Sequence, residues 1–187
     1  MLVLCEGSST EVGYFRALRS ELRLPRASIE LVGLGGGNPP GVAMAAVAHA
    51  AKAGRNRPEE RFDELWAVCD TDDPRRSGAA AALARMVDSG LDVALSHPTF
   101  EVWLLLHHGD VRGALHSAEA KRRVAAQGET AVAHWPLAAE RASRIRMEAV
   151  PAVQTPHPVK LVLATNPSTN VDELVQLLAD EAAKRRV

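Results

Sequence analysis

Carboxylates follow two apolar runs that have the composition of buried strands. Glu6 comes directly after LVLC, and Asp70, Asp72 and Asp73 follow the run LWAVC. Side chains two positions apart in an extended chain point the same way, so Asp70 and Asp72 could both face one ion. Carboxylate oxygens are ligands that Mg²⁺ and Mn²⁺ favour in proteins. The pattern predicts a divalent-metal site formed by Glu6, Asp70, Asp72 and Asp73.

The alternative interpretation of the three aspartates is a solvated turn that caps a helix before PRRSG. Two carboxylates ~4 Å apart repel by about 4 kcal/mol at an effective dielectric of 20. Three of them without a partner would cost much of the ~5–15 kcal/mol that stabilises a typical domain. A divalent cation removes that repulsion, so the magnitudes favour the metal site over the cap.

The elements that would position these acids are short apolar runs that alternate with helical patterns. Continuously apolar runs suit strands covered on both faces of a parallel sheet. Four strand–helix units in series predict an α/β fold with helices on both faces. Glu6 and Asp70 meet only if strands 1 and 3 are neighbours, which gives a four-stranded, mainly parallel sheet of order 2-1-3-4. The predicted strands are residues 2–5, 28–34, 62–70 and 91–97, and the predicted helices are residues 9–24, 40–54, 77–90 and 98–108.

Strand patterns stop at about residue 110, and helical patterns replace them. We expect an α/β core over residues 1–110 and a helical extension over residues 111–187 that packs on it. The stretch NPST, which begins at Asn166, is typical of a turn and a helix cap. Helical patterns in the extension cover residues 117–127, 137–150 and 170–187.

Cys5 and Cys69 directly precede Glu6 and Asp70. In matching register on neighbouring strands, their Cα atoms would lie about 4.8 Å apart. Burial beside acids raises the pKa of a thiol, so we expect neither cysteine to be a nucleophile. Two cysteines are also too few for a four-cysteine zinc site.

Further candidates cluster near the same predicted sheet edge, and each has a structural alternative. Gly35 and Gly36 could bind phosphate through backbone N–H groups or form a tight turn. Arg75 and Arg76 could hold a phosphate or pair with the neighbouring aspartates. His97 is a candidate acid or base near neutral pH, although a lone histidine is more often structural.

Glu101 follows the fourth predicted strand. It is either one more acid at the sheet edge or a first-turn glutamate that the helix dipole favours. The basic runs at residues 121–123 and 184–186 are solvated helix faces or a patch for a phosphate backbone.

Composition narrows the function classes. The chain has 187 residues and a net charge of −1, so nucleic acid would have to bind a local patch rather than a global basic field. No apolar run approaches the ~20 residues of a membrane span. No basic leader precedes the first apolar run, so we expect a cytoplasmic protein.

Five stretches taken together resemble the RloB family, which is associated with restriction-modification loci and phage defence. They are LVLCEGSSTEVGYFRALRSELRL, GLGGGNP, WAVCDTDDP, SHPTFEVWLLLHH and NPSTNVDELVQLL. The resemblance implies a core similar to the TOPRIM domain of topoisomerases, primases and OLD-type nucleases. It further implies that Glu6, Asp70 and Asp72 hold Mg²⁺ and that NPST packs near the site.

Two departures separate this sequence from the family pattern. Ser8 and Ser9 stand where the family usually has an acidic and a basic residue, so a lysine that could contact phosphate is missing there. His97-Pro98 replaces the more usual Asn-Pro.

We therefore expect a nuclease that uses Mg²⁺ or Mn²⁺ to hydrolyse phosphodiester bonds in DNA or RNA. Nucleic acid is the expected substrate, and a protein from the same defence operon is a candidate partner. The alternative is a subunit that binds or senses a nucleotide–metal complex without cleavage. Nucleotidyl transfer, as in primases, is a third candidate.

Overall fold

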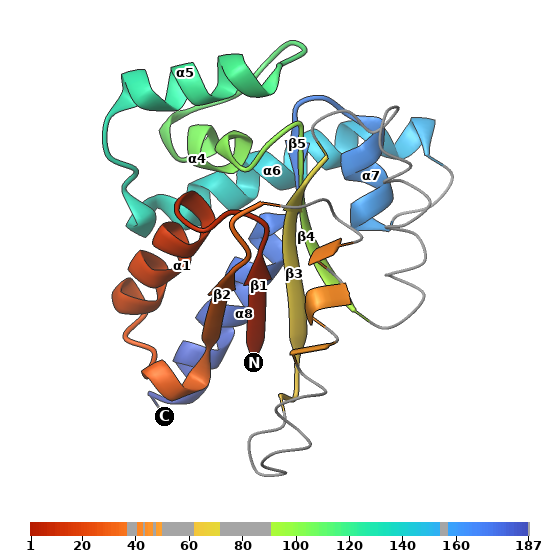
Figure 1. Cartoon of the computed structure of the whole chain (residues 1–187). Helices are drawn as coiled ribbons and strands as arrows, with labels where there is room; N and C mark the ends of the chain where they lie inside the picture. The colour runs from red at the N-terminus through yellow and green to blue at the C-terminus, as the bar shows by residue number, and fades with distance from the viewer. Residues whose placement is uncertain are drawn as a thin grey trace.

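A five-stranded sheet organises the computed structural model, which describes residues 1–36, 41–42, 44–46, 48–49, 62–71, 91–153 and 157–186. The strand order is β2-β1-β3-β4-β5, and the first four strands run parallel (Figure 1). The predicted order 2-1-3-4 is confirmed, and an antiparallel strand is added beside β4. The strands are β1 (Leu2–Cys5), β2 (Glu30–Gly33), β3 (Leu65–Asp70), β4 (Asp92–His97) and β5 (Ser168–Thr169).

Helices account for most of the remaining described chain. The N-terminal ones agree with the predicted pattern, and residues 41–49 are helical wherever they are described. The predicted helix at residues 77–90 lies outside the described residues. The α-helices are α1 (Thr10–Glu21), α4 (Glu101–His108), α5 (Ser117–Gln127), α6 (Trp135–Ala149), α7 (Pro158–Ala164) and α8 (Val171–Lys184), and 3₁₀ turns occupy Arg26–Ser28, Val132–His134 and Val150–Ala152.

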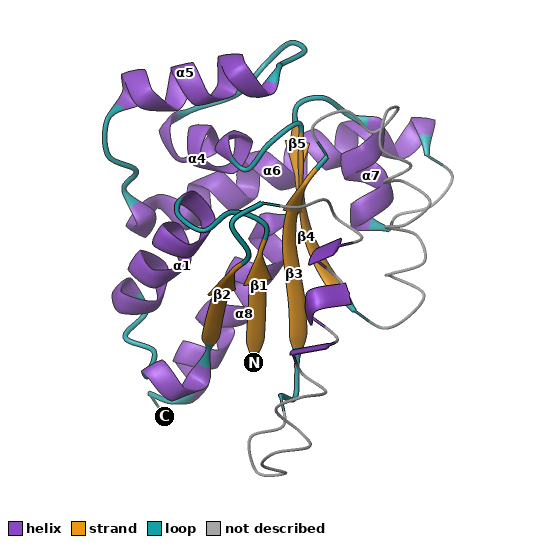
Figure 2. Ribbon diagram, in the orientation of Figure 1, coloured by secondary structure: helices purple, strands orange, loops and turns teal. Residues whose placement is uncertain are grey.

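Two apolar cores lie on opposite faces of the sheet, so helices cover both faces as predicted (Figure 2). The larger core includes Phe15 of α1, Trp103 of α4 and Leu174 of α8, each fully buried. Burying one such side chain contributes roughly 1.5–3 kcal/mol. The smaller core includes Val162 of α7 and also Val42. Because the two apolar cores pack against both faces of the sheet, they fix the strand ends that position side chains at the sheet edge.

The register of β1 and β3 differs from the prediction by one residue. Cys5 pairs with Val68 rather than with Cys69. Cys5 packs in the larger core and Cys69 in the smaller one, because neighbouring strand residues face opposite sides. The expectation that the two cysteines lie side by side is therefore wrong. Glu6 lies level with Cys69, one residue before Asp70, and its longer side chain spans that offset.

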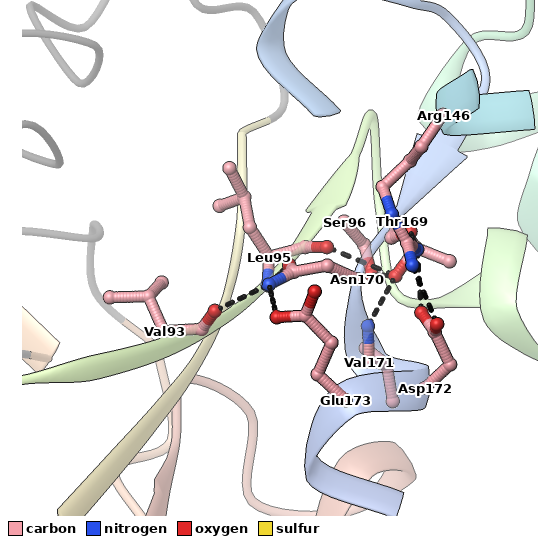
Figure 3. Close-up of polar contacts among 9 residues, drawn as sticks. All are labelled: Val93, Leu95, Ser96, Arg146, Thr169, Asn170, Val171, Asp172 and Glu173. Carbon is pink, nitrogen blue, oxygen red and sulfur yellow. Dashed lines mark hydrogen bonds and ion pairs between the residues drawn. The ribbon is translucent and has the colours of Figure 1, made fainter. Parts of the chain in front are cut away.

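The stretch NPST forms strand β5 in addition to leading into α8, which the predicted turn and cap did not include. Ser168 and Thr169 pair with the end of β4, and Asn170 continues that pairing with its side chain (Figure 3). Its Oδ1 accepts a hydrogen bond from Leu95 N at 2.7 Å, and its Nδ2 donates to Val93 O at 2.8 Å. A side-chain amide thus satisfies two backbone groups of β4 that the short strand does not reach.

A buried ion pair ties α6 to α8 beside this strand. Both Arg146 Nη atoms lie 2.6 Å from the two carboxylate oxygens of Asp172, and the guanidinium also donates to Thr169 O (Figure 3). A buried pair needs such additional hydrogen bonds to offset the desolvation of its charges. The pair orients the start of α8 so that Asn170 reaches β4. No described helix combines the length and apolar character that a membrane crossing requires.

Candidate functional site

The carboxyl ends of β1 and β3 bring Glu6 and Asp70 together, at the end of the molecule that carries α4 and α5 (Figure 1). Glu6 N donates to Val68 O at 2.9 Å, which continues the β1–β3 ladder by one bond. Its Oε2 accepts from the backbone N–H of Asp70 at 3.2 Å. The pairing of the two parallel strands therefore holds one carboxylate directly beside the other.

Thr99 connects Asp70 to a third acid, Glu101. The fully buried Thr99 hydroxyl lies 2.9 Å from Asp70 Oδ2 and 2.5 Å from Glu101 Oε2. A hydroxyl has a single proton, so it donates to one carboxylate at a time. Glu101 thus joins the sheet-edge acids and is not only a first-turn glutamate of α4.

Glu11, in the first turn of α1, is a fourth acid at this site. It is 7 % exposed, and its Oε1 accepts from Gly7 N at 3.1 Å. A Cβ atom on Gly7 would lie only 2.3 Å from Glu11 Oε2. A side chain at position 7 would therefore displace the Glu11 carboxylate from its place beside Gly7 N.

Burial and three neighbouring carboxylates raise the pKa of Asp70 well above its ordinary value. Burial of the Asp70 carboxyl is the largest cause, and the hydrogen bond from Thr99 opposes it. The negative charges of Glu11, Glu6 and Glu101 raise the pKa further. A proton or a cation must offset this accumulation of charge, since like charges in a partly buried site disfavour ionisation.

A cavity of about 320 Å³ opens over these acids. Gly35 and Gly36 form one wall, with φ angles of +77° and +130° that favour glycine. Gly36 N donates to Glu6 O at 2.8 Å, which ties the glycine loop to the end of β1. The cavity is lined by Glu6, Gly7, Ser8, Ser9, Thr10, Glu11, Gly35, Gly36, Asp70, Thr99, Phe100, Glu101 and Lys121.

The donor atoms of this cavity suit a hard divalent cation. Its described lining includes carboxylates and hydroxyls but neither cysteine nor histidine, which favours Mg²⁺ or Mn²⁺ over zinc. Burial raises the pKa of both cysteine thiols, so neither supplies a thiolate nearby. Within the described part of the chain, no three acidic, histidine or cysteine side chains already form a group at metal-binding distances.

A family model described as RloB-like protein matches residues 1–178. The chain belongs to the RloB-like family. Searches of curated proteins and of solved structures returned no match.

In this RloB-like chain, several predicted site residues lie elsewhere or outside the described residues. Asp72, Asp73, Arg75 and Arg76 fall in the undescribed range 72–90. His97 is buried and contacts the Thr71 hydroxyl through Nδ1, and it does not line the cavity.

Asn166 lies away from the acids and clips two segments of this RloB-like fold together. Its Oδ1 accepts from Leu115 N and its Nδ2 donates to Leu115 O, both at 3.0 Å. The clip holds the segment that leads into α5. Asn166 therefore stabilises the part of the cavity wall that α5 forms, and not the part that the acids form.

Sequence reasoning missed Thr99, Glu11 and Lys121 as cavity residues. The TE pair at Thr10 and Glu11 belongs to a stretch that carries the family resemblance, so position alone could have marked Glu11. Thr99 carried no signal beyond its place between a strand and Glu101. Lys121 is distant in sequence, and only the packing of α5 on α4 brings it to the site.

Proposed function

We propose that this RloB-like protein hydrolyses phosphodiester bonds in DNA or RNA with Mg²⁺ or Mn²⁺. The convergence of Glu6, Glu11, Asp70 and Glu101 on one open cavity supports this proposal most strongly. A charge cluster that costs stability when empty is expected where a cation completes it. The resemblance to TOPRIM domains, which hold Mg²⁺ at a matching glutamate and D-x-D pair, supports the same chemistry.

Glu6, Asp70 and Asp72 would hold the ion, with Asp73 as a further ligand. The bound ion would polarise the phosphate and lower the pKa of the attacking water. Thr99 fixes the orientation of the Asp70 carboxylate through its hydrogen bond. Glu11, which stands on the α1 side of the cavity, would accept the proton of the water.

The biological setting that we propose follows from the family resemblance. Association with restriction-modification loci supports a role in phage defence in the cytoplasm, with a protein of the same operon as partner. The wall formed by Gly35 and Gly36 would receive a phosphate through backbone N–H groups. Arg75 and Arg76 would contact the same anion from the segment after β3.

A second candidate is a subunit that binds or senses a nucleotide–metal complex without cleaving it. Ser8 and Ser9 favour this candidate, because they bring hydroxyls but no charge to the cavity wall. The two functions share the metal site and differ in whether a phosphodiester bond breaks.

Cleavage of labelled DNA and RNA in Mn²⁺, with and without chelator, tests the proposal. Asp70→Asn and Asp72→Ala should each lose about 100- to 1,000-fold in rate, because metal activation contributes several kcal/mol. Asp180→Asn is the matched control, since the only described residue to which this exposed carboxylate hydrogen-bonds is Gln176 on the surface of α8.

Thermal unfolding in Mn²⁺ separates the two candidates. If Mn²⁺ stabilises the parent but not Asp70→Asn, and no substrate is cut, the binding subunit replaces the nuclease. Cleavage that survives in both Asp70→Asn and Asp72→Ala would exclude any mechanism built on these acids.

A further inference from the structure

Helix α5 has three consecutive cations, and only one of them lines the acidic cavity. Arg122 and Arg123 both pair with Glu119 on the helix surface, and Arg123 Nε lies 2.8 Å from Glu119 Oε1. Lys121 lines the cavity and makes neither a hydrogen bond nor an ion pair with any described residue. Within the described lining it is also the only cation. The three side chains therefore have different roles despite their adjacency.

The position of Lys121 is set by contacts on either side of it. Ala120 is fully buried in the larger core, which anchors the first turns of α5 against α4. Upstream, the two hydrogen bonds between Asn166 and Leu115 fix the segment that enters α5. Because Ala120 is fixed in the core, the exposed Lys121 side chain beside it can reach only a limited region. That region is the mouth of the cavity.

Lys121 shares the lining of the cavity with the four carboxylates. No carboxylate of the cavity lies within the 4.0 Å that defines an ion pair with Lys121 among the described residues. The cavity lining therefore combines four carboxylates, which suit a divalent ion, with one ammonium group, and this is the charge pattern that a phosphate bound together with a metal ion requires.

We propose that Lys121 binds the phosphate of the nucleic-acid backbone while the ion on the acids holds the same phosphate from the opposite side. This inference rests on the proposed metal site. It assigns substrate binding to α5, some fifty residues beyond β3, while Ser8 and Ser9 on the facing wall contribute only hydroxyls. A lysine suits this role as a compact point charge with three donors.

The test measures binding of a fluorescein-labelled DNA oligonucleotide, and an RNA of the same sequence, in Mn²⁺. Anisotropy is read within seconds of mixing, before cleavage accumulates. Lys121→Met should raise Kd by about three- to tenfold and reduce the slope of log K against log salt by about 0.9 on duplex DNA, as expected for one lost phosphate contact. Lys121→Arg keeps the charge and should retain most of the affinity.

Arg122→Met is the control, because it removes an adjacent cation that does not line the cavity. Equal Kd values and salt slopes for Lys121→Met and Arg122→Met would overturn the role of Lys121. Inorganic phosphate is the competing probe: displacement of the oligonucleotide by phosphate only in the parent and Lys121→Arg supports a phosphate contact.

A separate Mn²⁺ titration, followed by thermal unfolding, distinguishes this failure from failure of the proposed function. Lys121→Met should bind Mn²⁺ at least as well as the parent, because removing a cation does not weaken a cation site. If the parent does not bind Mn²⁺, or if Asp70→Asn binds it equally well, the metal site fails and this inference fails with it.

Discussion

Replacing Asn170 tests the hydrogen bonds that join α8 to the edge of β4. The side chain is 1 % exposed and satisfies Leu95 N and Val93 O. Asn170→Ala would leave both backbone groups buried without a partner, at about 1–3 kcal/mol each. We therefore expect the free energy of unfolding to fall by about 2–6 kcal/mol, a large part of the stability of a typical domain.

Asn170→Asp refines the test because it keeps the shape and changes only the donor. One carboxylate oxygen can still accept from Leu95 N, but the other would face Val93 O and the carboxylate of Glu173. Burial already raises the pKa of Glu173, and a second charge would add repulsion. A protonated carboxyl group can donate to Val93 O, so this variant should recover stability as the pH falls toward the pKa of the new group.

Urea unfolding at several pH values measures both effects. Gln176→Ala is the control on the same helix, because within the described part of the chain this exposed side chain hydrogen-bonds only to Asp180, and we expect a change within about 0.5 kcal/mol. If Asn170→Ala proves as mild as Gln176→Ala, the side-chain clip does not stabilise β4 and the reasoning is refuted.

Three further predictions concern the site and its surroundings. Asp70→Asn should raise the melting temperature in chelator by about 2–4 °C for each kcal/mol of repulsion removed, and should abolish stabilisation by Mn²⁺; a lower melting temperature in chelator would contradict this. Gly7→Ala should slow Mn²⁺-dependent cleavage, because the new Cβ would displace the Glu11 carboxylate that is proposed to accept the proton of the water, and an unchanged cleavage rate would refute it. Burial lowers the pKa of His107 to about 4, so the folded protein binds fewer protons than the unfolded chain between pH ~6.5 and ~4, and stability should fall by about 3 kcal/mol as the pH drops through that window. His107→Phe should flatten this pH dependence in urea unfolding while losing the hydrogen bonds to Tyr14 and Ala131, and an unchanged slope would assign the effect to other groups.

The strand order was predictable from the sequence because two independent requirements agreed on it. Continuous apolar runs demanded a parallel sheet, and the acids at Glu6 and Asp70 demanded neighbouring strands. The register was not predictable in the same way. Cys5 and Cys69 each directly precede an acid, but they do not pair with each other between β1 and β3. The Glu6 side chain is long enough to reach Asp70 despite the one-residue offset between the strands. The pattern of residue types along the chain does not show which side chain will bridge such an offset.

Strand β5 and the cavity wall escaped prediction for a different reason. Two residues, Ser168 and Thr169, are too few to show a strand pattern, and an asparagine side chain replaces the rest of the strand. Lys121 and Glu11 reach the site through the packing of α5 and α1. The sequence offered a solvated helix face or a phosphate-backbone patch for Lys121, but it did not place either residue in the cavity. Long-range packing determines such positions, and periodicity along the chain does not encode it.

The pairing of β4 with β5 also has a consequence for the order in which the chain can fold. The groups that cover the outer edge of β4 come 71 to 77 residues later in the chain. During synthesis, that edge therefore stays open until α8 begins to emerge, and an open strand edge is a template for pairing with other chains. A fragment that stops at residue 110 would keep this edge permanently exposed, so we expect it to aggregate rather than to behave as an autonomous unit.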